Sequence, residues 1–149
     1  MKNKKSYGAD NDLNLKALVT LSRCFQSVRR REMRTIKQVG LTAAQFGVLE
    51  ILYHKGNLRI GEILEGTLST GGNMTVVIEN LEKTGFVVRY PDPQDGRASL
   101  IRITEKGYKL VENMFPGHVA NIGGIFSVLS TEEKQQLVEL LKKLGSSNG

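Results

Sequence analysis

The sequence predicts a mainly α-helical chain with one small β-hairpin, built as a single unit over residues 1–149. Three observations predict this class. Apolar residues recur at three-to-four spacing along most of the chain, which is typical of amphipathic helices. The period changes after Gly85, where β-branched and aromatic residues follow one another. The length of 149 residues, with 40% hydrophobic and 24% charged residues, fits one globular domain.

The first predicted helix spans residues 13–40. Its apolar positions are Leu15, Leu18, Val19, Leu21, Phe25, Val28 and Ile36. Gly40 follows the last of them, as expected at a helix C-terminus. The apolar stripe is long for a helix packed on a small core. The helix therefore either packs along other long helices or pairs with another chain.

Thr42 and Gln45 form a capping box, which predicts a second helix that ends near Gly56. A short segment, residues 59–65, follows with Ile60, Ile63 and Leu64 on one face. Gly66 and residues 67–72 have the composition of a turn.

The next helix runs from residue 70 to about Thr84, and its core stripe is Met74, Val77, Ile78 and Leu81. Gly85 closes it, at the position where a left-handed residue is favoured. Residues 86–90 and 100–103 are predicted strands, and residues 91–97 have turn chemistry throughout. The resulting hairpin must lean on helices, because an isolated two-stranded hairpin is marginal in water.

Thr104 caps a further helix, whose apolar face holds Tyr108, Val111, Met114 and Phe115. Pro116 and Gly117 fall inside this pattern and are expected to kink or interrupt the helix. Ser130 and Glu133 form a second capping box. The last helix carries a stripe of Leu137, Leu140, Leu141 and Leu144.

Positive charge is concentrated in the first third of the chain. Residues 1–40 hold ten Lys and Arg against three Asp and Glu, whereas residues 41–104 hold six against seven and residues 105–149 five against five. Two interpretations stay open. The surplus is either a solvated helix face with a disordered tail, or it attracts a polyanion over long range.

The remaining composition restricts the function classes. The apolar runs are shorter than the ~18–20 residues of a membrane helix, and the basic N-terminus lacks the apolar stretch of a signal peptide. A single cysteine, Cys24, is typical of a reducing compartment, so we expect a cytoplasmic protein without a membrane partner. Cys24 itself is either a helix-packing residue or a thiol made reactive by its basic neighbours.

The residues present do not favour an enzyme. His54 and His118 are distant in sequence, and neither has metal-ligand spacing to a second His or Cys. We expect both to be polar or partly buried helix residues. Gly71-Gly72 precedes a helix without the Lys-Ser/Thr of a phosphate loop. We therefore expect no catalytic site, no cofactor and no metal.

The order helix, short helix, turn, helix, hairpin suits DNA binding, because a helix fits the major groove and a hairpin can reach beside it. The face of residues 70–84 opposite the core stripe is polar. Side chains there that can meet bases or phosphates are Asn73, Thr75, Val76 and Lys83. Thr70, Gly71 and Gly72 place backbone amides at the helix N-terminus, which is an anion site. A plain solvated helix face is the alternative.

Three runs of residues resemble the MarR family of regulators. Residues 41–49 resemble its second helix, residues 72–89 its recognition helix and the entry to its wing, and residues 92–97 and 103–107 its wing and the start of its fifth helix. The resemblance implies a homodimeric winged helix-turn-helix protein. In that arrangement residues 13–40 and 104–145 would be dimerisation helices, and residues 41–103 the DNA-binding lobe.

The resemblance also implies roles for single residues. Arg89 would lie at the entry to the wing, and Asp95 would position Arg97 at its tip for insertion into the minor groove. Many members have a second basic residue where this chain has Gly96. Some relatives bind small aromatic effectors between the dimer helices and the DNA lobe, and the Pro116-Gly117 interruption would leave space there.

The sequence thus favours a sequence-specific regulator of transcription that binds double-stranded DNA at a pseudo-palindromic operator, a repressor released by a small aromatic effector. Two alternatives stay open: a winged-helix module that binds another protein, and a regulator that senses oxidants through Cys24. Salt-dependent binding to DNA separates the first alternative from the main interpretation.

Overall fold

The computed structural model describes residues 2–67 and 73–146. Six helices and a small sheet follow one another in the order α1 (Ala9–Gln38), α2 (Ala43–Lys55), β1 (Leu58–Arg59), α3 (Ile60–Gly66), α4 (Met74–Lys83), β2 (Val87–Asp92), β3 (Asp95–Ile103), α5 (Glu105–Phe126) and α6 (Thr131–Ser146). The mainly helical class with a β-hairpin is confirmed. No helix in the described ranges is long and apolar enough to cross a membrane.

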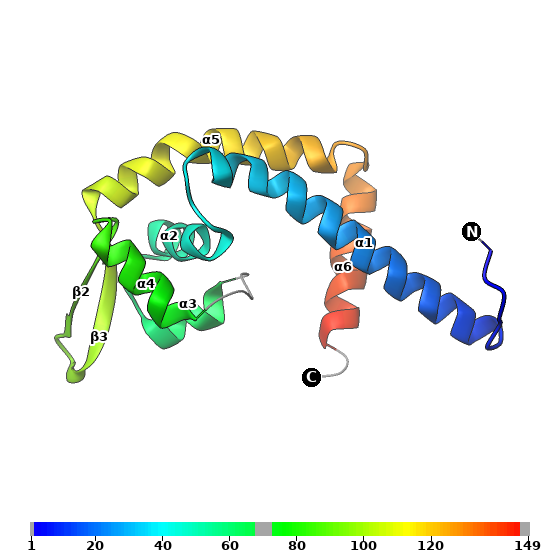
Figure 1. Ribbon diagram of the computed structural model, residues 1–149, viewed down its shortest axis with the longest axis horizontal. Coiled ribbons are helices and arrows are strands. Elements are labelled where there is room, and N and C mark those ends of the chain that lie inside the picture. Colours follow the sequence, from blue (N-terminus) through cyan, green and yellow to red (C-terminus); the bar gives the residue numbers. More distant parts are fainter. Residues whose placement is uncertain (1, 68–72, 147–149) are drawn as a thin grey trace.

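The elements from α2 to β3 (residues 41–103) form one compact unit, which we call the lobe. Figure 1 shows α1 and α5 lying side by side above α2, with α4 and the β2–β3 hairpin below the start of α5. The N-terminal part of α1 and the whole of α6 project away from this lobe. We call residues 9–35 of α1 together with α6 the arms.

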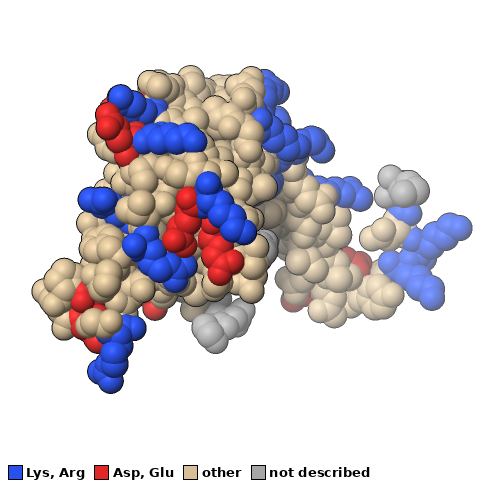
Figure 2. Space-filling view, turned by 60° about the vertical axis from the view of Figure 1, so that its left-hand side comes forward, with Lys and Arg blue, Asp and Glu red and all other residues tan. Residues whose placement is uncertain are grey.

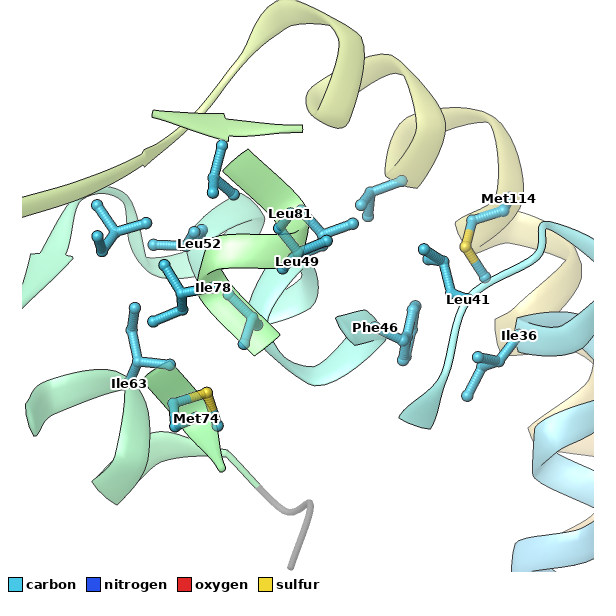
Figure 3. Packing of buried hydrophobic residues seen from close by; sticks show 14 residues of the cluster. Ile36, Leu41, Phe46, Leu49, Leu52, Ile63, Met74, Ile78, Leu81 and Met114 are labelled. Carbon is cyan, nitrogen blue, oxygen red and sulfur yellow. The ribbon is translucent and has the colours of Figure 1, made fainter. Parts of the chain in front are cut away.

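The core lies where α2, α3 and α4 meet the sheet and α5. Figure 3 shows side chains from these elements and from the end of α1 pointing toward one another, among them Ile36, Leu41, Phe46, Leu49, Leu52, Ile63, Met74, Ile78, Leu81 and Met114. Within α1, described throughout, Ile36 is the one buried residue, and none of the described residues 131–146 of α6 is buried. The arms therefore contribute almost nothing to the core of the single chain.

Helix starts agree with the predicted capping boxes. The Gln45 backbone N–H donates to Thr42 Oγ1 at 3.1 Å, and Gln45 Oε1 accepts from the Thr42 N–H at 3.0 Å. The Ser130–Glu133 pair repeats this reciprocal bonding ahead of α6. Gly85 closes the segment after α4 with a φ of 80°, the left-handed conformation predicted for it.

The corner at Gly85 is fastened to the start of α5. Thr104 Oγ1 donates to the Gly85 carbonyl at 2.6 Å and accepts from the Gly107 N–H at 3.2 Å. Gly107 lies so close to the residue before β2 that a Cβ there would come within 2.4 Å of the Phe86 carbonyl oxygen. The hairpin thus leans on α5, as the marginal stability of a free hairpin requires.

Several local expectations are wrong. Helix α4 begins at Met74, after its N-cap Asn73, rather than at residue 70. Residues 58–59 form β1 beside β3, so the sheet has the order β1-β3-β2 rather than being a two-stranded hairpin. The strands also extend through the predicted turn, and Pro91 pairs with Ser99. Proline is tolerated there because β2 is an edge strand. Leu64 is 55% exposed, whereas Ile63 is buried in the core and Ile60 packs against it.

The interruption expected at Pro116 and Gly117 is absent from α5, which continues through both residues. Proline removes the hydrogen bond to the carbonyl four residues earlier, at Glu112. Both Glu112 and Pro116 are exposed, so water can hydrate that carbonyl. The buried residues Val111, Met114 and His118 hold the opposite face of the helix in place.

Candidate nucleic-acid interface

α4 presents one face to the core and another to solvent. Met74, Ile78 and Leu81 are buried, whereas Thr75, Val76 and Lys83 are exposed. Val76 is an apolar side chain with 48% of its surface exposed. The predicted contact residues of this helix therefore share the outward face, where a partner can reach them.

Asn73 caps the start of the same helix. Its Oδ1 accepts a hydrogen bond from the Thr75 backbone N–H at 2.9 Å, which makes it the N-cap of α4. Only the amide NH2 of Asn73 is left for a partner. The predicted residues Thr70, Gly71 and Gly72 lie outside the described residues.

The wing, which is the β2–β3 hairpin, carries the predicted Asp95–Arg97 pair at its tip. Asp95 Oδ1 accepts from the Arg97 backbone N–H at 3.1 Å and lies 3.5 Å from Arg97 Nε. The Arg97 side chain is 95% exposed. An exposed guanidinium on a restrained backbone can enter a narrow, negatively charged groove.

Arg89 is less available than the sequence suggests. Its Nη2 lies 3.1 Å from Glu82 Oε1, so the guanidinium joins β2 to α4. Each side chain is about one-third exposed. This ion pair braces the wing against α4, whatever else Arg89 contacts.

A further ion pair, between Arg59 and Asp92, has no counterpart among the predicted residues. Arg59 Nε and Nη2 donate to Asp92 Oδ2 at 2.9 and 2.5 Å. The hydrogen bond from the Gln94 backbone N–H and those from Arg59 lower the pKa of Asp92 below its ordinary value. No local motif could have revealed this pair, because the partners are 33 positions apart.

Charge on this side of the molecule is mixed. Figure 2 shows acidic and basic side chains interleaved on the forward face, which forms no continuous basic surface among the residues drawn in colour. The balance of six basic against seven acidic residues over 41–104 agrees with that view. Binding of a polyanion here must depend on a few well-placed cations rather than on net charge.

A cavity of about 400 Å³ lies between α1, α2, α5 and the end of α3. Its lining mixes aromatic, apolar and charged side chains, including Arg29, Glu32, Ile36, Phe46, His54 and Phe115. Arg29 and Glu32 form an ion pair of 2.8 Å. Neither Pro116 nor Gly117 is part of the described lining, so the space does not come from a broken helix.

The two histidines, far apart in sequence, lie on either side of Phe115. Ring centroids are 4.8 Å apart for His54–Phe115 and 5.8 Å for Phe115–His118. His118 is buried and its Nδ1 shares a 2.7 Å hydrogen bond with Thr35 Oγ1 of α1. His54 is exposed and bonds the Glu50 carbonyl. Aromatic packing thus connects α2 and α5 beside the cavity, and the Thr35–His118 hydrogen bond connects α1 to them.

Comparison with known proteins gives a consistent result. The model of the MarR family matches residues 41–99. The HTH-type transcriptional regulator MhqR of Bacillus subtilis (strain 168) is 38% identical over 132 residues, which are 89% of this chain and 91% of MhqR. The uncharacterized HTH-type transcriptional regulator YkoM of the same strain is 40% identical over 124 residues, 83% of this chain and 80% of YkoM.

The fold has close structural counterparts as well. The structure of Bordetella bronchiseptica BpsR, described for the regulation of its DNA binding by 6-hydroxynicotinic acid, superposes with a TM-score of 0.77. The two sequences are 27% identical, and the match covers 99% of each chain. The relatives MhqR and YkoM are regulators of transcription and not enzymes. An α4 with an exposed face, a wing beside it and similarity over 89% of the chain to such a regulator place the chain in the MarR family of transcriptional regulators.

Proposed function

We propose that this regulator acts as a cytoplasmic homodimer that binds double-stranded DNA with sequence specificity, with residues 41–103 as the DNA-binding lobe. One observation carries the proposal: the exposed face of α4 and the exposed Arg97 of the wing lie on neighbouring elements braced by the Glu82–Arg89 pair. Two elements of different shape can then read one duplex together.

The two elements have different roles. Thr75 and Val76 on α4 suit the edges of bases in the major groove, where a hydroxyl can hydrogen bond and a methyl can touch thymine. Asn73 joins them with its amide NH2. Thr70, Gly71 and Gly72, which lie outside the described residues, stay predicted contacts to phosphate. Lys83 contacts phosphate from the other end of α4. Arg89 contacts phosphate only when its guanidinium leaves the ion pair with Glu82. Asp95 presents Arg97 to the minor groove.

The homodimer follows from the arms. α1 exposes the large apolar residues Leu13, Leu15, Leu18, Val19, Leu21 and Phe25, and α6 exposes Val138, Leu140 and Leu141. Exposed apolar patches of this extent are rare on monomers. Residues 13–40 and 104–145 of two copies would cover each other. A symmetric dimer presents α4 twice, so the operator is a pseudo-palindrome with half-sites ~10–10.5 bp, or a multiple, apart.

Release of a repressed operator by a small aromatic effector fits the cavity between α1, α2 and α5. Phe46, His54 and Phe115 offer ring surfaces, and Arg29 offers a charge already oriented by Glu32. BpsR, whose DNA binding responds to 6-hydroxynicotinic acid, supports an aromatic ligand. The cavity lies between the dimerisation helix α1 and the lobe, so a ligand bound there can favour one distance between the two lobes of the dimer. A ligand that favours a distance unsuited to DNA shifts the dimer away from DNA.

The DNA proposal is tested by fluorescence anisotropy on the DNA upstream of the gene, at several salt concentrations. Arg97→Ala should weaken binding to all sequences and lower the salt slope by about one unit. Thr75→Ala and Val76→Ala should cost about 1–3 kcal/mol each and relax preference at particular base pairs. Lys109→Ala, an exposed lysine of α5, is the matched control for loss of one positive charge.

The outcomes separate the functions. A wild-type dimer without salt-dependent DNA binding would favour the winged-helix module that binds another protein. A change of base preference in Arg97→Ala, with none in the α4 variants, would reverse the roles of wing and helix. Asn73→Ala is a poorer probe, because it also removes the N-cap of α4.

The effector proposal is tested by adding 6-hydroxynicotinic acid, benzoic acid and phenol to the protein–DNA complex. We expect at least one to release DNA and to raise the unfolding temperature of the free protein. His54→Ala removes an exposed ring of the lining without opening the core, and should raise the concentration needed for release. Release that is unchanged in His54→Ala would place the ligand elsewhere.

A further inference from the structure

The distal wing is held by polar contacts rather than by a hydrophobic core. Within the described stretch 91–100, Asp92 is the one buried residue, with 7% of its surface exposed. Its Oδ2 accepts both hydrogen bonds from Arg59, and its Oδ1 accepts from the Gln94 backbone N–H at 2.9 Å. Both oxygens of this carboxylate are therefore committed at the base of the wing tip.

Arg59 is itself fixed by three connections. It precedes the first residue of α3, and its backbone N–H donates to Glu62 Oε1 at 3.0 Å. It also pairs with Leu100 across β1 and β3. A single residue thus ties the first residues of α3 and the middle of β3, through its backbone, to the end of β2, through its side chain.

The tie reaches Arg97 through the strand register. Asp92 lies opposite Asp95 across the two-residue turn, and the ladder is irregular between Pro91 and Asp92. Asp95 in turn restrains the backbone and side chain of Arg97. Because none of the apolar residues in the described stretch 91–100 is buried, the direction of Arg97 depends on where Asp92 is held.

We propose that Arg59 is a positioning residue for DNA binding: through Asp92 it holds the wing at the angle at which Arg97 meets the duplex. The proposal rests on the proposed function, since it requires that Arg97 contact DNA. Charge-assisted bonds to a buried carboxylate suit this task, because they are directional and because the carboxylate is costly to leave unpaired.

A double-mutant cycle tests the proposal in the full-length protein. DNA affinity and salt slope are measured for wild type, Arg59→Met, Arg97→Ala and the double variant. We expect Arg59→Met to weaken binding and lower the salt slope by about one unit, as Arg97→Ala does. In the Arg97→Ala background, Arg59→Met should change affinity less than twofold. Full additivity of the two losses would overturn the proposal, because Arg59 would then act on DNA by itself.

Asp92 could affect DNA binding through its charge alone or by holding the wing in position. The two explanations predict opposite changes in DNA affinity for Asp92→Asn. Removing a negative charge near DNA strengthens binding if only electrostatics matters. The proposal predicts weaker binding, because asparagine forms a poorer pair with Arg59. Tighter binding by Asp92→Asn would overturn it. Asp92→Glu, which keeps the charge, is the partial-rescue control.

Amide exchange in the free protein separates this inference from the proposed function. Arg59→Met should speed exchange over residues 93–99 much more than exchange of α2, although leaving the Asp92 carboxylate unpaired also lowers the unfolding temperature. Unchanged exchange there would overturn the positioning role even if DNA binding is as proposed. Wild type that fails to bind DNA in a salt-dependent way would refute the proposed function instead, with the exchange result intact. A uniform rise in exchange across the lobe would also overturn the inference, since Arg59 would then serve general stability.

Discussion

Helices α2 and α6 both begin with a capping box, yet α2 is packed in the core and α6 is exposed. α2 buries Ala44, Phe46, Val48, Leu49 and Leu52 in the lobe, whereas none of the described residues of α6 is buried. Its leucine stripe is as regular as that of a core helix. Local hydrogen bonds thus set where a helix starts, and the packing partner sets whether its apolar face is covered.

α1 shows the same contrast within one helix. Its last turn carries Ile36 into the core, and Thr35 binds His118 of α5. Farther toward the N-terminus, Leu18 and Phe25 are more than half exposed. The core of the lobe is covered within the chain, whereas the apolar faces of the arms are exposed, and we propose that a second copy covers them. The predictions below test this division in order of expected size.

The largest effect is expected in the core of the lobe. Leu49 has no exposed surface, so Leu49→Ala leaves a cavity and should lower the free energy of unfolding by about 2–5 kcal/mol. Leu140→Ala, at an exposed leucine of α6, is the control and should change unfolding of the lobe by less than about 0.5 kcal/mol. Urea titration followed by circular dichroism measures both. Similar losses in the two variants would contradict the division.

Substitutions in the arms should weaken association of the dimer rather than folding of the lobe. Phe25→Ala removes a 65% exposed aromatic side chain of α1, and two copies of the change meet in a symmetric dimer. We expect the dimer dissociation constant to rise at least tenfold, about 1.4 kcal/mol. Sedimentation equilibrium measures it, with Arg30→Ala on the same helix as control. A wild-type protein of 16.5 kDa in solution would contradict the dimer.

Helix α5 offers a matched pair of glycines, one packed against the lobe and one with open space beside it. Gly107→Ala forces a Cβ to within 2.4 Å of the Phe86 carbonyl oxygen and should destabilise the lobe by about 1–3 kcal/mol. Gly123→Ala meets no described atom within 4 Å and should be neutral or slightly stabilising, since alanine favours helix. Thermal unfolding compares them. Equal effects would mean that α5 does not anchor the hairpin at Gly107.

The two capping boxes should report different kinds of unfolding. Thr42→Ala removes the N-cap of a core helix and should lower the global free energy of unfolding by about 1 kcal/mol. Ser130→Ala removes the equivalent cap of α6, and its cost should appear as faster amide exchange of α6 alone. A loss of global stability in Ser130→Ala would show that α6 is part of the cooperative unit.

The smallest effect concerns acid. The pKa of Asp92 is lowered in the folded protein, first by the Gln94 N–H and then by Arg59. A lowered pKa means that the pair stabilises the fold above the unfolded-state value, and that this contribution disappears as pH falls through the folded-state value. The stability difference between wild type and Asp92→Asn should therefore shrink below about pH 4. A difference that grows on acidification would contradict this assignment.

Part of the candidate site could be predicted from sequence because its chemistry is local. Asp95 and Arg97 are two residues apart, so the spacing already allows the hydrogen bonds that the structure contains. The alternation of buried and exposed residues on α4 follows from helical period alone. The partners of Arg89 and Arg59 could not be predicted, because Glu82 and Asp92 reach them only after the sheet has formed.

By itself the sequence determined the order of the helices, the caps at Thr42, Thr104 and Ser130, the left-handed Gly85 and the existence of a hairpin, since each depends mainly on nearby residues. The N-cap Asn73 of α4 was not predicted, because the periodic pattern alone does not fix where that helix begins. The tertiary structure decided what local rules leave open. β1 has two residues and becomes a strand only because β3 supplies its hydrogen bonds. Pro116 stays inside a helix because water reaches the carbonyl it leaves unbonded and buried neighbours hold the other face. The wing takes its direction from Arg59 and Asp92, 33 positions apart, because a buried carboxylate requires a charged partner from wherever the fold can bring one.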